Sequence, residues 1–331
     1  MLQFIKQYRK LLIILIFPYI YLLFVLVAPT EQAVIAPGGL TEVSEVITIE
    51  GYDMVDNFNT IFVYSYYPIT PFQSWVLATD RTMDIYPMTD RQKDMSKKDE
   101  YLQGQLSKYV SFKTAIIKAY ELASLEKPEI IINYHYEGLY VYYRPNRLTE
   151  LEIGDQIISI NGNNYSDYTH NEFIVLANVD NASFLIKRSV GDTFEYLTVN
   201  YEKGIDEPSM FFYPNNVIDT ASPAFEFPGL DSIVGGPSGG LLQTLSIYVS
   251  LVKLNIGDLK ITGTGTMDVN GQVGRIGGIT QKMYTAIYNN ADIFFIPESH
   301  FSEIPNLDYP YELVRIETVE QAVQWLNERF N

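Results

Sequence analysis

The sequence predicts an α+β protein that is held in a membrane by an N-terminal helix. Three observations lead to this fold class. Residues 11–28 are apolar and uncharged, β-rich runs and one amphipathic helix fill residues 45–126, and short strands alternate with helices over residues 204–331. A second β-rich segment, 127–203, lies between segments 45–126 and 204–331.

The N-terminal residues form the predicted membrane anchor. The tail 1–10 carries three basic residues, and the run LLIILIFPYIYLLFVLVA at 11–28 is just long enough to span a bilayer. The positive flank predicts a cytosolic tail and a remainder outside the cell, as in a single-pass protein of the cell membrane. A cleaved signal peptide is the alternative, but a proline follows Ala28 and no small-x-small site precedes Pro37.

The segment after the anchor is expected to contain a linker, several strands and a helix. Residues 29–44 hold two prolines and two glycines and are interpreted as a linker. The runs ITIEGY, TIFVYSYY and SWVLATD, between Val46 and Tyr86, indicate strands. The charged residues 89–104 are interpreted as a surface loop, and residues 105–124 as a helix with one apolar side.

The end of the chain predicts a small α/β core. Strands are expected at 291–297 and 311–316, followed by a helix in which Thr318 and Gln321 form a capping-box pattern. Trp325 on this helix is interpreted as a core residue.

Composition narrows the classes of function. The chain has 40 acidic and 23 basic residues and a net charge of −17, which disfavours nucleic-acid binding. It has no cysteine and no His/Asp/Glu cluster with metal-ligand spacing, so we expect no metal. The dipeptide Gly-Lys is absent, which excludes a phosphate-binding loop of the P-loop type. We therefore expect no cofactor, no nucleotide and no nucleic acid as a partner.

The run GGPSGG at 235–240 is the strongest candidate for a catalytic element. Small neighbours around Ser238 let a substrate backbone approach and leave amide N–H groups near Pro237 and Gly239 to hold an oxyanion. The run LLQTLSIYVSLVKL that follows indicates a buried helix. Ser238 would lie at or just before its N-terminus, where the helix dipole favours negative charge. The alternative is a plain glycine-rich turn.

A nucleophilic serine needs a base, and Lys282 is the best candidate. It follows an Asn-Gly hairpin signal at 270–271 and a glycine pair at 277–278. It then falls in the first turn of a predicted helix with Thr280 as its N-cap. Burial and the positive end of the helix dipole both lower a lysine pKa, as a general base requires. Taken alone, Lys282 would be an ordinary surface lysine.

Together these motifs resemble the proteolytic domain of Lon-type serine peptidases. The resemblance covers roughly residues 225–300. Its motifs, in the family's order, are GGPSGG at 235–240, TGT at 264–266, GRIGGITQK at 274–282 and IFFIP at 293–297.

The resemblance implies a Ser-Lys dyad of Ser238 and Lys282, which are 44 residues apart, with Thr264 assisting the lysine. Two positions depart from the family's usual pattern. Gly239 replaces an alanine, and Gly235 stands where ATP-dependent members carry an acid. The second departure fits the membrane-anchored, PDZ-containing branch of the family. Residues 45–126 also look like the opening of such a proteolytic domain, so the resemblance implies one protease domain in two pieces, 45–126 and 204–331, with an insertion between them.

The insertion resembles a PDZ domain over residues 137–162, above all in LEIGDQIISING. A Gly-Asp turn at 154–155 leads into an alternating strand that ends at an Asn-Gly turn. PDZ domains bind an extended peptide as an added strand and hold its end with backbone amides. The resemblance places that loop at Glu137–Val141. The residues expected to contact a peptide there are Gly138, Leu139, Tyr140 and Val141.

The expected function is that of a membrane-anchored, ATP-independent serine endopeptidase that cleaves peptides or proteins at the outer face of the cell membrane. The PDZ-like module would recruit the substrate, and self-association into a homo-oligomer is left open. One alternative is a membrane-tethered peptide-binding protein with an inactive protease domain. Another is an α/β-hydrolase, because residues 236–240 fit G-x-S-x-G and His300 is the one histidine after the serine, although few residues remain for that fold.

Overall fold

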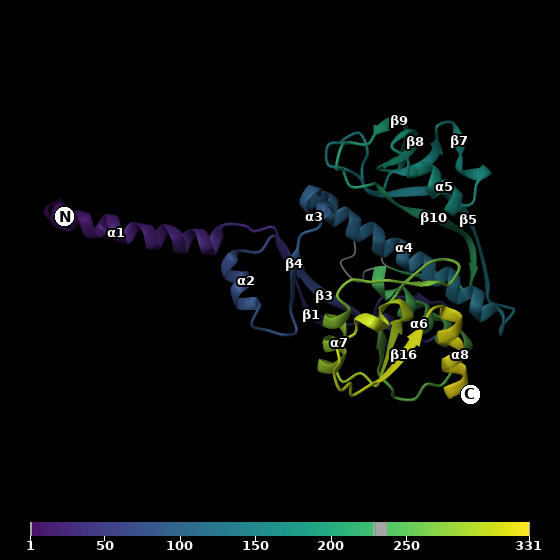
Figure 1. Cartoon of the computed structure of the whole chain (residues 1–331). Helices are drawn as coiled ribbons and strands as arrows, with labels where there is room; N and C mark the ends of the chain where they lie inside the picture. Colours follow the sequence, from purple (N-terminus) through teal and green to yellow (C-terminus); the bar gives the residue numbers. More distant parts are fainter. Residues whose placement is uncertain (1, 228, 230–236, 331) are drawn as a thin grey trace.

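A single long helix extends from the folded part of the protein at its N-terminus. The computed structural model describes residues 2–227, 229 and 237–330, and in it α1 comprises Leu2–Val27 (Figure 1). The stretch Gln7–Val27 is long and apolar enough to cross a membrane, and none of it is buried inside the protein. The rest of the described chain is mixed α+β, as predicted.

The first sheet combines strands from both ends of the chain. Among the described residues it has six strands in the order β16-β15-β12-β3-β1-β4. Their bounds are β1 Gln32–Glu42, β3 Phe58–Tyr66, β4 Asp84–Pro87, β12 Ile261–Gly263, β15 Ile293–Pro297 and β16 Glu312–Ile316. Strand β12 pairs in parallel with β3 and β15, whereas β1 is antiparallel to β3 and β4. The β3–β12 pair therefore joins the two predicted pieces in one sheet.

Helices cover both faces of this sheet. Their bounds are α4 Lys97–Ser124, α6 Gly240–Val252, α7 Ile279–Tyr288 and α8 Val319–Phe330. Successive side chains of β15 point to opposite faces. Ile293 and Phe295 pack in the core with α4, α6 and α8, and Phe294 and Ile296 pack in a second core with α7. Both faces are thus buried, which explains the unbroken apolar run of β15.

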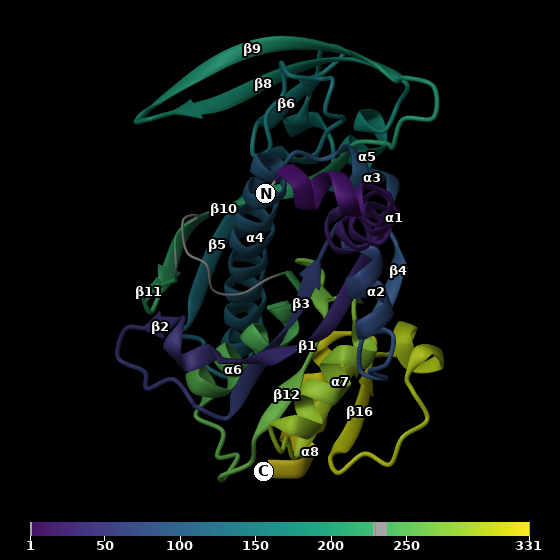
Figure 2. The ribbon, with the colours of Figure 1, turned by 90° about the vertical axis from the view of Figure 1, so that its left-hand side faces the viewer.

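The second sheet forms a separate β-rich module. Within the described residues its strand order is β10-β5-β6-β8-β9, with β7 paired to β6, and Figure 2 shows the long curved hairpin of β8 and β9. The bounds are β5 Ile131–Tyr143, β6 Gln156–Ile160, β7 Asn163–Asn164, α5 His170–Ala177, β8 Asn181–Val190, β9 Thr193–Glu202 and β10 Phe211–Ser222. The sheet continues beyond residue 203, the predicted end of the insertion, because β5 takes β10 as its antiparallel partner.

Helix α4 connects the two cores. Its Leu106 packs in the core of the β-rich module, and its Phe112 and Ile116 pack in the core of the first sheet. Figure 1 shows α4 passing between the two parts. The remaining elements are short. They are η1 Val43–Glu45, β2 Thr48–Ile49, α2 Pro71–Leu77, α3 Asp90–Asp94, η2 Tyr165–Asp167, β11 Phe225–Glu226, η3 Pro237–Gly239, β13 Thr266–Met267, β14 Val273–Gly274 and η4 Glu298–Glu303.

The predicted linker 29–44 is wrong, because most of it forms β1. Ala33 and Val34 are buried in the sheet, so this segment contributes to the core. The register shifts between Pro37 and Gly39, which marks a bulge. A proline has no N–H to donate to a ladder, and a bulge accommodates it without breaking the strand.

Two further local predictions are also wrong. The run SWVLATD lies largely in helix α2, because Thr70 and Gln73 form a capping box and Pro71 occupies the first helical turn. Residues 89–104, predicted as a loop, contain α3 and the start of α4, whose N-cap Ser96 accepts from the Asp99 amide.

The C-terminal predictions are confirmed. Strands β15 and β16 lie where they were expected, and Thr318 and Gln321 form both reciprocal bonds of the capping box at α8. The Trp325 ring packs edge-on against Phe295, with centroids 5.4 Å apart, at the margin of the core.

Candidate active site

Ser238 lies in the short turn η3, which leads directly into α6 at Gly240. Almost all of α6 is buried, as expected for the helix behind the serine. Gly235 and Gly236 of the GGPSGG run lie outside the described residues. The serine is therefore carried by the N-terminal end of a rigid core helix.

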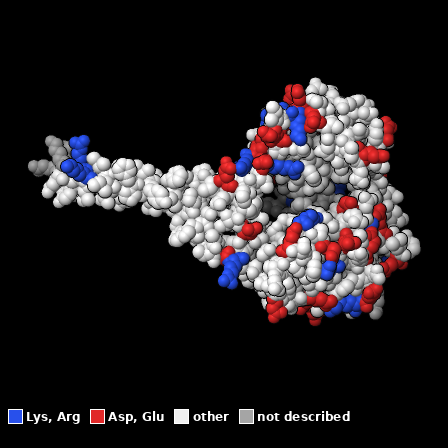
Figure 3. Space-filling view, viewed as in Figure 1, with Lys and Arg blue, Asp and Glu red and all other residues white. Residues whose placement is uncertain are grey.

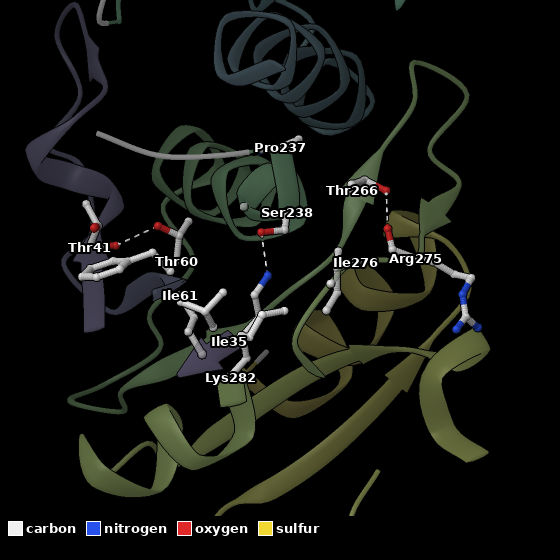
Figure 4. Close-up of a pocket in the computed structure, with 14 residues that line it drawn as sticks. Ile35, Thr41, Thr60, Ile61, Pro237, Ser238, Thr266, Arg275, Ile276 and Lys282 are labelled. Carbon is white, nitrogen blue, oxygen red and sulfur yellow. Dashed lines mark hydrogen bonds between the residues drawn. The ribbon is translucent and has the colours of Figure 1, made fainter. Parts of the chain in front are cut away.

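The fold brings Ser238, Thr264 and Lys282 together from three elements. The Nζ of Lys282 is 2.6 Å from the Oγ of Ser238 and 2.9 Å from the Oγ1 of Thr264. Figure 4 shows the lysine side chain rising from α7 to meet the serine below α6. These distances are within hydrogen-bond range, so a proton can pass directly between serine and lysine.

Burial changes the proton affinity of Lys282. The residue is 2% exposed, and the loss of water around its ammonium group lowers the pKa of Lys282 to about 7. No carboxylate in the described part of the chain offsets this effect. A lysine in this state is available as a base near neutral pH.

The start of α7 differs from the prediction. Thr280 is not the N-cap, because the helix already begins at Ile279 and the cap is Gly278. Gly278 has a φ of +67°, a left-handed conformation that glycine adopts without strain. The sequence pattern identified the helix but placed its first residue two positions late.

The segment after β12 holds the turn that carries Ser238 in place. Both the amide of Gly265 and the Oγ1 of Thr264 donate to the carbonyl oxygen of Ser238, at 2.8 and 3.1 Å. Thr264 is fully buried and its amide donates to Phe295 of β15. Thr264 therefore contacts both the lysine and the backbone of the serine.

The dyad opens into an apolar cavity of about 830 Å³. Ile35, Ile61 and Ile276 surround the Ser238–Lys282 pair in Figure 4. Arg275 also lines the cavity, but its guanidinium turns away and donates to the carbonyl of Ser299, 2.7 Å away. The space beside the dyad therefore suits apolar groups.

A side-chain contact accounts for the glycine at position 239. A Cβ added to Gly239 would lie 2.9 Å from the Cγ2 of Thr60 and 3.3 Å from Gln243. Thr60 thus occupies the space that an alanine would need. Pro237 lines the cavity but has no N–H, so any oxyanion donor in this turn is the amide of Ser238 or Gly239.

The alternative triad with His300 does not form. The Nε2 of His300 accepts from the amide of Ile276 at 2.8 Å, and its Nδ1 is 2.9 Å from a carboxylate oxygen of Glu303. Both ring nitrogens are therefore occupied away from Ser238. His135 and His170 belong to β5 and α5 of the β-rich module.

The predicted peptide-binding loop at Glu137–Val141 is wrong. These residues, including Gly138, lie in the middle of β5, with β10 on one side and β6 on the other. Leu139 pairs with both Pro214 and Ile157, and Tyr140 with both Tyr213 and Gln156. The segment expected to be a loop is therefore part of a strand, and at Leu139 and Tyr140 it has no open edge for an added peptide.

No sequence pattern pointed to Ser111. This residue of α4 donates to Gln243 of α6 at 3.2 Å and lies 3.5 Å from the carbonyl oxygen of Pro237. It is thus a link between α4 and the nucleophile turn. Serine within an amphipathic helix has no distinctive pattern, so only tertiary contacts could reveal it.

The chain matches none of the protein-family models and none of the curated proteins with which it was compared. Within the described residues there is also no group of three or more His, Asp or Glu side chains that could hold a metal ion. What the site can do chemically is therefore argued from its own geometry.

Proposed function

We propose that this protein is a membrane-anchored serine endopeptidase of the Lon type, with Ser238 as nucleophile and Lys282 as general base. One observation carries the proposal. The Nζ of Lys282 is 2.6 Å from the Oγ of Ser238 in a buried site that lowers the lysine pKa to about 7. Among the described residues Lys282 has no carboxylate partner, and it instead contacts a serine at the start of a helix. This arrangement fits an acyl-transfer site better than a structural ion pair.

In the proposed reaction, neutral Lys282 takes the proton of Ser238 while Oγ attacks the scissile carbonyl carbon. The negative charge that develops on the carbonyl oxygen is held by the amides of Ser238 and Gly239. The lysine then gives its proton to the leaving amine, and an acyl-enzyme remains. Water, activated by the same lysine, hydrolyses the ester and restores both groups. Thr264 keeps the lysine directed at the serine.

The proposed substrate is a peptide or an unstructured segment with apolar residues near the cleaved bond. The isoleucines that surround the dyad favour such side chains. Because the chain has no phosphate-binding loop, the reaction would need no ATP.

We also propose that the β-rich module, which resembles a PDZ domain, recruits the substrate. Its edge strands are β10 and β9, not the central β5, and β10 is the edge strand that lines a cavity next to the dyad. A second cavity, of about 420 Å³, lies between β10 and α4 and shares Pro237, Thr266 and Arg275 with the dyad cavity. A peptide along β10 would therefore lead toward Ser238.

The proposed topology places the tail 1–10 in the cytosol and the catalytic part outside the cell. The basic residues before the apolar helix support this orientation. External protease added to intact cells should then digest the bulk of the chain, whereas protection of that bulk would contradict the orientation.

The activity is tested with the full chain in nanodiscs, incubated with an unfolded protein and no nucleotide. Mass spectrometry should detect internal cleavage products, and Ser238→Ala and Lys282→Ala should each yield none. If the wild type binds peptides without cleaving them, the inactive peptide-binding alternative holds instead. A strict requirement for added ATP would also contradict the proposal.

A further inference from the structure

Helix α2 is short, uncharged and not covered by the rest of the protein. Its sequence is PFQSWVL, and none of its residues is buried. Phe72, Trp75 and Val76 lie on one side at i, i+3 and i+4, and are 41%, 72% and 43% exposed. A helix of this length is marginal in water unless its apolar side is covered. An exposed aromatic patch of this kind marks an interaction surface.

The place of α2 in the fold identifies what covers it. The amide of Thr30, just after α1, donates to the carbonyl of Ile69, just before α2, and the amide of Ile69 donates back to Gln32. These bonds hold α2 beside the end of the apolar helix α1, and Figure 1 shows α2 lying across that end. In the space-filling view the surface along α1 and over α2 is free of charge, apart from the basic N-terminal end (Figure 3).

An aromatic row connects this region with the catalytic cavity. Phe62, Tyr64 and Tyr66 alternate along β3 and therefore share one face. Their rings are in contact, with centroid separations of 5.6 and 6.3 Å, and each is between 42% and 58% exposed. Phe62 lines the dyad cavity, and Tyr66 ends the strand from which the chain continues into α2. In Figure 2, which looks along α1, β3 points toward this region.

We propose that α2 lies in the interfacial layer of the lipid bilayer beside α1, as a second membrane contact. This inference rests on the proposed membrane anchor. Tryptophan and phenylalanine on an amphipathic helix are the residues that settle between headgroups and acyl chains. Two contacts fix the orientation of the protease domain, which a single helix would leave free to rotate. The aromatic row then faces the membrane side, and the catalytic cavity is held a short distance from the lipid.

The two tryptophans of the chain allow a direct test. The full chain with Trp325→Phe keeps Trp75 as its one tryptophan and is reconstituted in phosphatidylcholine/phosphatidylglycerol vesicles with or without brominated acyl chains. Trp75 emission should be blue-shifted and quenched about twofold or more by the brominated lipid, as for an interfacial side chain. The matched variant Trp75→Phe keeps Trp325, which packs against Phe295, and should not be quenched.

The outcomes separate this inference from the anchor itself, which is measured by flotation of the same vesicles. Protein that floats but shows water-like, unquenched Trp75 emission would overturn the α2 contact and leave the anchor standing. Blue-shifted but unquenched emission would mean that α2 packs against a second copy, which also overturns it. If the protein does not float with the vesicles, both the anchor and the α2 contact are contradicted. If Trp325→Phe does not fold, the emission of the wild type minus that of Trp75→Phe gives the contribution of Trp75.

Discussion

At the residue scale, the proposed chemistry depends on one buried lysine. A lysine in water has a pKa of about 10.4 and is protonated at neutral pH. Burial lowers the pKa of Lys282 to about 7, so a large fraction is neutral under those conditions. In the proposed mechanism, the fold thus supplies a base without a histidine.

The first prediction follows from that pKa. Because only neutral Lys282 can accept the serine proton, kcat/KM should rise with pH through about 7 and then level off. Lys282→Arg should be inactive, since guanidinium stays protonated. The double variant Ser238→Ala/Lys282→Ala should lose little more than either single one, because the two groups act as a unit. Activity that is independent of pH between about 6 and 9 would rule out the lysine as base.

The second prediction concerns the stability cost of the same burial. The folded pKa of about 7 lies below the ordinary lysine value of 10.5, so between these values the unfolded chain binds more protons. The stability of the wild type should therefore rise with pH across this window. Lys282→Met should be more stable by on the order of a few kcal/mol at about pH 6, with the gain shrinking toward pH 10.

Denaturant unfolding at several pH values measures this difference. Lys98→Met, which replaces an exposed lysine on α4, is the control and should change stability little at any pH. A Lys282→Met protein that is less stable than the wild type at about pH 6 would contradict the burial cost.

The third prediction tests the contact between Gly239 and Thr60. Gly239→Ala should lower kcat, because the new methyl group would press on the Cγ2 of Thr60 and displace the turn that carries Ser238. Thr60→Ser removes that Cγ2 and keeps the hydroxyl that donates to Thr41. The double variant should therefore regain most of the activity. Equal activity of Gly239→Ala with and without Thr60→Ser would show that the contact does not decide the residue type.

At the element scale, α4 links the β-rich module to the turn that carries Ser238. It contributes Leu106 to the core of the module, and its Ser111 contacts both Pro237 and Gln243 near the serine. Strand β10 also belongs to the sheet of the module. Deletion of residues 128–202 would thus leave β10 without its partner, so point substitutions test the link better.

The fourth prediction uses Ser111 as a positioning residue. Loss of one such buried hydrogen bond is worth about 1 kcal/mol, which corresponds to a roughly fivefold lower kcat if the bond holds the nucleophile turn. Ser111→Ala should thus lower kcat with little change in KM or in the pH profile. Ser124→Ala, at the C-terminal end of α4, removes a bond to the Glu121 carbonyl of the same helix and should be nearly silent. Equal effects of the two substitutions would assign Ser111 a purely structural role.

At the scale of the whole molecule, the proposed membrane contacts hold the dyad cavity at a constant distance from the bilayer surface. The fifth prediction is that the full chain in vesicles cleaves a lipid-tethered peptide with a short spacer faster than the same peptide free in solution. The advantage should disappear for the full chain in detergent micelles, where no bilayer surface aligns the two. If vesicle-bound protein cleaves the tethered and the free peptide at equal rates, the orientation of the protein does not select substrates.

Local patterns in the sequence were sufficient for several features. The uncharged run after a basic tail predicted α1, the unbroken apolar run predicted β15, and the Thr318–Gln321 spacing predicted the cap of α8. Glycine and serine in one short run singled out Ser238. In each case the information lies within a few neighbouring residues, since helix periodicity, capping and backbone freedom are local properties.

Other features were decided by contacts between distant segments. Residues 29–44 have the composition of a linker but form β1, because β3 and β4 supply its hydrogen-bond partners. Residues 137–141 resemble a loop motif but lie within strand β5, where Leu139 and Tyr140 are paired on both sides. The low pKa of Lys282, the role of Thr60 beside Gly239 and the link through Ser111 depend on burial and on atoms far away in the chain. Sequence thus determined which residues could react, and tertiary packing decided their distances and protonation, because both depend on what excludes water from the site.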